Sequence, residues 1–353
     1  MPKLTLLALA LVVGCGSPPP LNPKAVLHQH RGLRLLAANR MDEAEAELTL
    51  ALEYNPGYAD AENGLGLIAF RRGDLRGAVD HFRRALGHNE DHVEANSNFG
   101  VVLLAWDDYL EAERAFRAAL AVDPGFTQAR YNLALVLLRT GRLTPAHAQL
   151  RKVVALAPEM AEAHADLGCL LLHLGRISAA DRELRQARSL NPELASAHRC
   201  TARLLRGGGD LAAAEAELRT ALRCAPSDAD SLFELALTLA LAGRVEEAMR
   251  DLAVLLRRRP DAAEGRFAMG FLLGRQERWA EAERHLNRAV ALRPRYPAAH
   301  LELGDLLRRR GKHEQARRHY SLFLERVPME LLEHRRRVVE WIGRDGRLAG
   351  GRS

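Results

Sequence analysis

The sequence predicts an all-α protein, built as a solenoid of nine stacked helical hairpins. Prolines recur every 34 residues, and Glu90 stands where one proline of the series is missing. The prolines lie at Pro56, Pro124, Pro158, Pro192, Pro226, Pro260, Pro294 and Pro328. Aromatic residues are only 5% of the chain, whereas alanine, leucine, arginine and glutamate, which favour helices, are frequent. A fixed period of this length indicates a repeat architecture.

Residues 1–14 are predicted to be a lipoprotein signal peptide. One cation, Lys3, precedes an apolar run over residues 4–13 that is too short to span a bilayer. Residues 12–15, with the sequence Val-Val-Gly-Cys, resemble the lipobox of bacterial lipoproteins. The resemblance implies that Cys15 receives a diacylglyceryl group and becomes the mature N-terminus.

Residues 15–24 are expected to form a lipidated, Pro-rich tether. Gly16 and four prolines within this stretch oppose helix formation and favour an extended chain. In the lipoprotein family, aspartate after the cysteine favours retention in the inner membrane. Gly16 therefore implies a lipid-anchored, periplasm-facing protein of the bacterial outer membrane.

Residues 25–328 divide into nine 34-residue units without insertion or deletion. We number the positions of each unit from its first residue, which is residue 25, 59, 93, 127, 161, 195, 229, 263 or 297. Position 20 is alanine in all nine units, and position 24 is large and apolar. A leucine-glycine or similar pair occupies positions 7 and 8 of five units, as in Leu65-Gly66. Small residues allow the two helices of a hairpin to approach closely, and the proline ends the second helix.

This pattern resembles the tetratricopeptide repeat (TPR). The resemblance implies a helix-turn-helix in each unit and a superhelix with a concave groove, in which end repeats need polar caps. Residues 329–353 are expected to form a capping helix and tail. Leu331, Leu332, Val338, Val339 and Ile342 are expected to lie on the last repeat, with Arg335, Arg336 and Arg337 facing water.

The sequence gives no indication of catalysis, and we predict that the protein is not an enzyme. The Gly64–Ala69 segment matches a dinucleotide-binding fingerprint only superficially, because it lies inside a predicted helix instead of following a strand. The net charge of +6 comes from 51 basic and 45 acidic residues, and no nucleic-acid-reading motif accompanies it. We expect no cofactor, nucleic acid or small-molecule substrate.

The histidines are interpreted as structural. Four of them share position 4 of their repeats, which indicates a common packing role: His28, His164, His198 and His300. His88 and His92 are four residues apart, but a zinc site needs further converging ligands. No metal site is expected.

Three cysteines remain after Cys15 is assigned to lipid. Cys200 and Cys224 are predicted to lie at neighbouring ends of one hairpin, so a disulfide between them is one interpretation. The other is that Cys169, Cys200 and Cys224 are all small buried apolar residues. Both remain open. A further expectation is a weak point at Gly207-Gly208-Gly209, because glycine relaxes the backbone.

The resemblance places partner contacts at positions 2, 5, 9, 12 and 13 of the first helices. The first apolar strip comprises Leu67, Phe70, Val101, Leu104, Tyr131, Leu135 and Leu138. The second comprises Phe233, Leu237, Phe267 and Phe271. Such strips suit an amphipathic helix or an extended apolar peptide, although packing between repeats would also explain them.

Polar residues complete the candidate groove. Arg199, Arg203 and Arg206 share one helix face and could pair with carboxylates or phosphates of a partner, or could simply be solvated. Asn98 and Asn132 occupy position 6, where some family members hold a peptide backbone. The lysine and asparagine clamp of chaperone-binding members does not occur in any repeat.

A lipoprotein made of such repeats resembles the pilotin family of type IV pilus systems, which assists assembly of the secretin channel. The resemblance implies a non-catalytic scaffold for protein–protein interactions in the cell envelope. The alternative is a platform that recruits envelope enzymes such as peptidoglycan hydrolases or proteases. In both cases a protein or peptide binds the repeats, and the N-terminal lipid binds the membrane.

Overall fold

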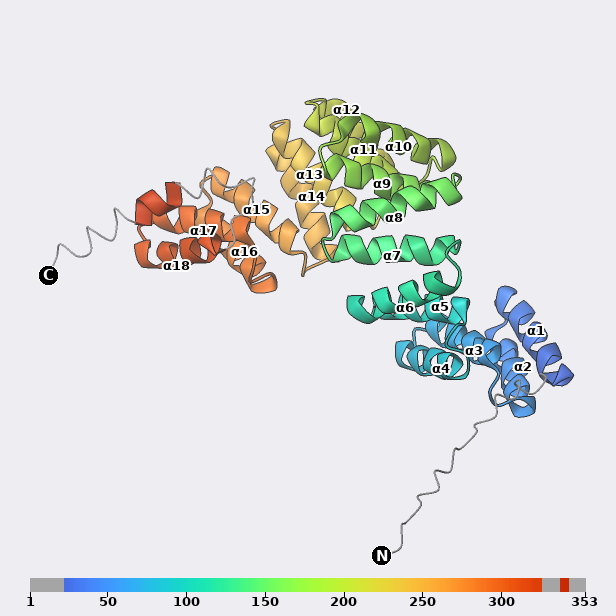
Figure 1. Ribbon diagram of the computed structural model, residues 1–353. Helices are drawn as coiled ribbons and strands as arrows, with labels where there is room; N and C mark the ends of the chain where they lie inside the picture. The colour runs from blue at the N-terminus through green and yellow to red at the C-terminus, as the bar shows by residue number, and fades with distance from the viewer. Residues whose placement is uncertain (1–21, 326–336, 343–353) are drawn as a thin grey trace, which may run out of the picture. The chain divides into compact units, whose positions relative to one another are not determined.

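The computed structural model describes residues 22–325 and 337–342, and within these ranges the chain is helical without any strand (Figure 1). The expected signal peptide lies outside the described residues. The expected tether does so too, except for residues 22–24. None of the described helices is both long enough and apolar enough to cross a membrane.

Each 34-residue unit forms a pair of helices, as predicted. The first helices are α1 (Pro23–Ala37), α3 (Ala59–Arg71), α5 (Val93–Ala105), α7 (Thr127–Arg139), α9 (Ala161–His173), α11 (Ala195–Gly207), α13 (Ala229–Leu241), α15 (Ala263–Arg275) and α17 (Pro297–Arg309). The second helices are α2 (Met41–Tyr54), α4 (Leu75–His88), α6 (Tyr109–Val122), α8 (Leu143–Leu156), α10 (Ile177–Leu190), α12 (Leu211–Cys224), α14 (Val245–Arg258), α16 (Trp279–Leu292) and α18 (His313–Leu324).

A left-handed residue at position 15 ends every first helix. Six repeats have glycine there, at Gly73, Gly141, Gly175, Gly209, Gly243 and Gly311, and three have Asn39, Asp107 or Glu277. In repeat 2, the Gly73 amide donates to the Phe70 carbonyl, and the next amide donates to the Ala69 carbonyl. These bonds use carbonyls that the helix end leaves unpaired.

Contact between the two helices of a hairpin depends on positions 8, 20 and 24. All nine alanines at position 20 are fully buried: Ala44, Ala78, Ala112, Ala146, Ala180, Ala214, Ala248, Ala282 and Ala316. A Cβ atom added to Gly66 would lie 2.7 Å from the ring of Phe82. Gly100 stands in the same relation to Phe116 and Gly304 to Tyr320. The recurring small residues therefore make room for the large side chain of the second helix.

The described residues form two compact units, which divide between Ala157 and Pro158. The division lies between repeats 4 and 5, at Pro158. In the second unit a continuous apolar core extends from Ala202 to Val338. The turn at Gly207–Gly209 has the same form as the turns of the other repeats, with Gly209 left-handed at position 15. The expected weak point at this turn stays a prediction.

The predicted cap is described only at residues 337–342, which are helical. Val338 is buried in the core of the second unit, and Ile342 and Trp341 pack against it. The expectation for Val339 was wrong, because this side chain is 48% exposed. Arg337 is exposed but also pairs with Asp305 at 2.7 Å. Leu331, Leu332, Arg335 and Arg336 lie outside the described residues.

Candidate functional site

In several repeats, the residue at position 4 of the first helix hydrogen-bonds to the turn before it, to its own hairpin, or to both. His164 Nδ1 lies 2.7 Å from the Glu183 carboxylate, and its Nε2 lies 3.0 Å from the Pro158 carbonyl oxygen. His198 has the same two kinds of contact, to Glu217 and Pro192. His300 contacts the equivalent proline carbonyl, and His28 contacts a glutamate of its own hairpin. The four histidines that share position 4 therefore all form hydrogen bonds within the fold.

His92 is also engaged within the fold. Its Nε2 lies 3.1 Å from Asp60 Oδ1, and its Nδ1 accepts a bond from the Ala95 amide at the start of α5. The carboxylate hydrogen bond of Asp60 raises the pKa of the His92 imidazole, and burial opposes this shift.

The first apolar strip lies on α3, α5 and α7 of the first unit. All seven side chains of the strip are half-buried, and Leu67 and Phe70 pack against the core formed around Phe82. Asn98 donates to Asn63 of the preceding repeat at 3.0 Å. Asn132 is buried, and its Nδ2 has no acceptor among the described residues. Position 6 faces the preceding repeat, so both asparagines are held within the protein, and partner contact by them stays a prediction.

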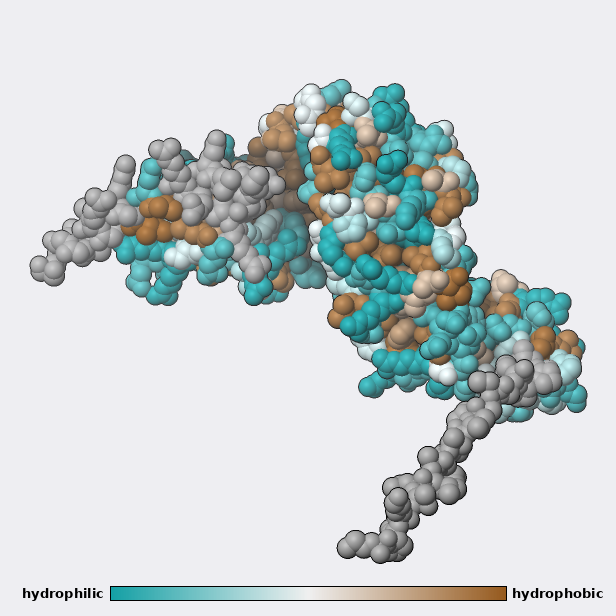
Figure 2. All heavy atoms as spheres, in the orientation of Figure 1, coloured by the Kyte–Doolittle hydropathy of each residue, from teal (hydrophilic) through white to brown (hydrophobic). Residues whose placement is uncertain are grey.

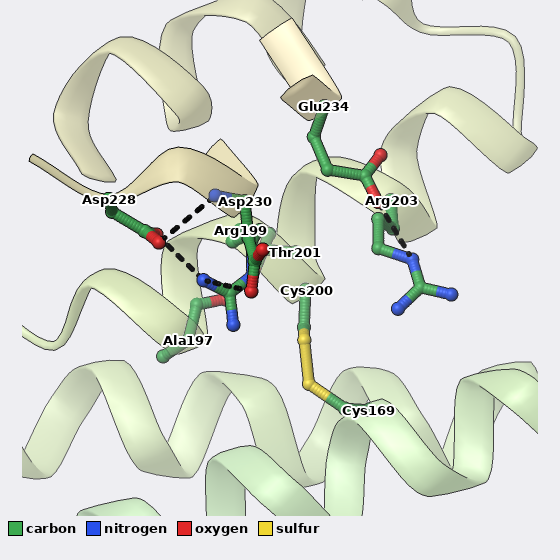
Figure 3. Close-up of a disulfide and its surroundings, with 9 residues drawn as sticks. All are labelled: Cys169, Ala197, Arg199, Cys200, Thr201, Arg203, Asp228, Asp230 and Glu234. Atoms are coloured by element: carbon green, nitrogen blue, oxygen red, sulfur yellow. Dashed lines mark hydrogen bonds and ion pairs between the residues drawn. A yellow bond between two sulfur atoms is a disulfide. The ribbon is translucent and has the colours of Figure 1, made fainter. Parts of the chain in front are cut away.

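Arg199 and Arg203 of repeat 6 pair with acidic residues at the end of that repeat and in repeat 7 (Figure 3), and Arg206 does the same. Arg199 Nη1 lies 2.7 Å from Asp228, and Arg203 Nε lies 3.6 Å from Glu234. Arg206 Nη1 lies 2.6 Å from the same glutamate. Their charges are therefore offset within the chain, and an incoming anion would have to compete with these carboxylates. This pairing joins α11 to the start of α13.

The second apolar strip opens into a hollow of 630 Å³ in the second unit. Leu237, Phe267 and Phe271 of the strip line it, together with Leu241, Leu272 and other apolar side chains. Among the described residues, Arg206 and Arg275 are its only charged lining residues. Leu241 is 65% exposed, so an apolar side chain projects into solvent at this hollow. Phe233 instead lines a neighbouring polar hollow with Arg199, Arg203 and Glu234.

A smaller hollow of 280 Å³ shares Phe271 and Arg275 with the apolar one. It is lined by charged side chains that include Glu302, Asp305, Arg309 and Arg337. Burial raises the pKa of Glu302 to about 7, Asp305 adds to the shift, and the nearby arginines oppose it. The candidate groove of the second unit therefore has an apolar part, between α13 and α15, beside a charged part.

The sequence model of the tetratricopeptide repeat family matches residues 31–95, 98–161, 165–229, 201–263 and 267–328. The chain belongs to the TPR family. A comparison with curated protein sequences found no match.

Several solved structures share this TPR fold. PilF of Pseudomonas aeruginosa is 20% identical, with a TM-score of 0.54, and the match covers 59% of this chain and 95% of PilF. A TPR protein from Parabacteroides merdae is 17% identical, with a TM-score of 0.60 and coverage of 70% and 98%. Cut9–Hcn1 of the APC/C is 18% identical, with a TM-score of 0.63. That match covers 80% of this chain and 55% of the other. These likenesses show the fold alone.

A disulfide joins Cys169 of α9 to Cys200 of α11, across the boundary between TPR repeats 5 and 6 (Figure 3). The interpretation that Cys200 pairs with Cys224 was wrong, and Cys224 is an exposed free thiol. Cys200 occupies position 6, which faces the preceding first helix instead of its own second helix. The Cα atoms of the bonded pair are 5.5 Å apart, within the range that a disulfide requires.

Reasoning from the sequence also missed some lining residues. Leu241 and Arg275 occupy position 13, which the TPR pattern already assigns to the groove, so their register could have revealed them. Trp106 had no such signal. It is 51% exposed at the α5–α6 turn, beside a hollow of 420 Å³ that it lines with Arg76, Arg83 and Asp108.

Proposed function

We propose that this TPR protein is a non-catalytic, membrane-anchored scaffold of the bacterial cell envelope, which holds an apolar segment of another protein between α13 and α15. The observation that carries the proposal is the apolar hollow with the exposed Leu241. A TPR protein is expected to mediate protein–protein interactions, and this hollow is lined almost wholly by apolar side chains. Removal of such surface from water would stabilise a complex by about 25 cal/mol per Å² before the costs of association.

The location at the membrane rests on the N-terminal sequence and is supported by the disulfide. Cys15 follows a signal-like apolar segment. Disulfides persist in the periplasm and other oxidising compartments, whereas cytosolic thiols are kept reduced. The Cys169–Cys200 bond is thus consistent with export. Attachment to a membrane would confine the groove there and raise its effective concentration toward an envelope partner.

Leu241→Glu tests the groove. Because Leu241 is already exposed, this change places a charge at the apolar hollow with little effect on the core. We would crosslink the intact protein in membranes, capture it, and compare the recovered proteins between wild type and variant. A partner that wild type recovers and Leu241→Glu loses supports the proposal.

Ile177→Glu is the matched control, because Ile177 is 52% exposed at the start of α10 and does not line the hollow. Equal recovery by wild type and both variants would refute binding in this groove.

Recovery of a secretin or pilus component would support the finer proposal of type IV pilus or secretin assembly. That proposal rests on the resemblance of signal, lipobox and repeats to pilotins.

The hollow beside Trp106 favours a second candidate, a platform for folded envelope enzymes such as peptidoglycan hydrolases or proteases. Its lining comes from α4, from Leu103 of α5 and from the turn between α5 and α6, and not from the groove positions of the first helices. An exposed tryptophan flanked by arginines is typical of a contact with a folded partner. Loss of a captured enzyme with Trp106→Ala, but not with Leu241→Glu, would favour this function.

A further inference from the structure

The outer face of α1 differs from the same face of every later first helix. Positions 3, 7 and 10 pack against the preceding repeat, and in repeats 2 to 9 they are mostly buried small or apolar residues, such as Ala61, Leu65 and Ile68 of α3. In the first repeat the same positions are Leu27, Arg31 and Arg34, and all three are exposed. No earlier repeat covers them in the described structure.

This face carries charge of one sign only. Lys24, Arg31 and Arg34 are exposed on α1, His30 lies beside them in the sequence, and α1 contains no acidic residue. Within the described part of the chain, neither Arg31 nor Arg34 forms an ion pair. A terminal cap needs a polar surface, but it does not need charges of a single sign.

Most acidic residues of the neighbouring α2 already have a partner other than Lys24, Arg31 and Arg34. Asp42 and Glu45 pair with Arg72, which follows α3. Glu43 pairs with Arg40, and Glu47 lies 2.7 Å from His28. Among the acidic residues of α2, Glu53, next to Tyr54, is left without a partner in the described residues, so one carboxylate remains near the cations of α1.

Apolar and aromatic groups lie among these cations. Leu27 is 45% exposed on the same helix face, one turn before Arg31. Tyr54, at the end of α2, is 40% exposed, and the Lys24 ammonium lies 5.2 Å from the centre of its ring. Basic side chains around an exposed leucine and a tyrosine are the composition of helices that lie at a membrane interface.

We propose that the face formed by Lys24, Leu27, Arg31, Arg34 and Tyr54 docks on an anionic lipid surface. The cations attract lipid phosphates, and Leu27 and Tyr54 enter the boundary between headgroups and acyl chains. The N-terminal sequence supports this partner over an acidic protein. Cys15 precedes Pro23 by eight residues, so a lipid on Cys15 would hold α1 within about 28 Å of the bilayer. The inference rests on the membrane location proposed above and adds an orientation to it.

Vesicle co-sedimentation tests the surface itself. We would use the full chain with Cys15→Ser, so that no lipid is attached, and compare phosphatidylcholine vesicles with vesicles that also contain phosphatidylglycerol. We expect binding to the anionic vesicles only, weakened by high salt. Arg31→Gln with Arg34→Gln should reduce this binding by about 30-fold, since each cation near an anionic surface contributes about fivefold.

The matched control is Arg151→Gln with Lys152→Gln, which removes the same charge from exposed positions of α8. It should leave vesicle binding unchanged. The docking proposal fails if wild type does not bind anionic vesicles, or if both double variants bind equally. Partner capture from detergent extracts separates this result from the proposed function, because it depends on Leu241 and not on Arg31 or Arg34.

Discussion

At the scale of single residues, position 15 shows how one backbone requirement recurs through the chain. Its left-handed conformation suits glycine, but Glu277 adopts it with φ of 63°. A side chain in this region costs about 1 kcal/mol or more. Glu277→Gly should therefore stabilise the protein by about 1 kcal/mol in urea unfolding. Gly243→Ala, at the equivalent position, should destabilise it by a similar amount, and no difference between the two variants would contradict this explanation.

Glu302 gives the molecule a pH dependence near neutrality. Burial raises its pKa to about 7 in the folded protein, above the ordinary glutamate value of 4.5. As pH rises from 4.5 to 7, the unfolded chain releases this proton first, so the free energy of unfolding falls and then levels off above pH 7. Glu302→Gln cannot ionise and should be more stable than wild type at pH 8 by about 2 to 3 kcal/mol.

The measurement is chemical unfolding of both proteins at pH 4.5 and pH 8. The difference between variant and wild type should be larger at pH 8, because other titrating groups affect both proteins alike. A difference independent of pH would show that Glu302 ionises in the folded protein as it does in the unfolded chain.

At the scale of elements, the disulfide adds a covalent bond between two first helices. Cys169 and Cys200 are 31 residues apart, and closing a loop of that length stabilises a protein by about 3 to 4 kcal/mol in the chain-entropy model. Cys169→Ser with Cys200→Ser should lower stability by this order, and reduction of wild type should have the same effect. Cys224→Ser should not, because Cys224 is a free exposed thiol.

Non-reducing peptide mapping would check the pairing directly. A peptide that links Cys200 to Cys224 would contradict the structure.

The sequence could not identify the partner of Cys200, because the choice depends on which helix position 6 faces. In the structure Cys200, at position 6, meets Cys169 at position 9 of the preceding first helix.

At the scale of the whole molecule, the 34-residue period predicted nearly all of the fold. A repeat contacts mainly its neighbours, so local spacing already determines which side chains meet within a hairpin. The period predicted the candidate groove less well. Leu237 and Phe233 are both half-buried groove positions, yet one lines an apolar hollow and the other lies among ion pairs. That difference depends on neighbouring repeats, which register within one repeat does not reveal.

The same dependence on neighbours predicts that loss of packing in one repeat destabilises mainly that repeat and those next to it. Phe82 is fully buried between the helices of repeat 2. Phe82→Ala should lower the free energy of unfolding of that repeat by about 3 to 5 kcal/mol. Because stability in a solenoid is a sum over repeats and their interfaces, hydrogen exchange should accelerate in α3 to α5 and remain slow in α13 to α17. Partner binding that depends on Leu241 should persist. Uniformly faster exchange along the chain would instead mean that the nine repeats unfold as one cooperative unit.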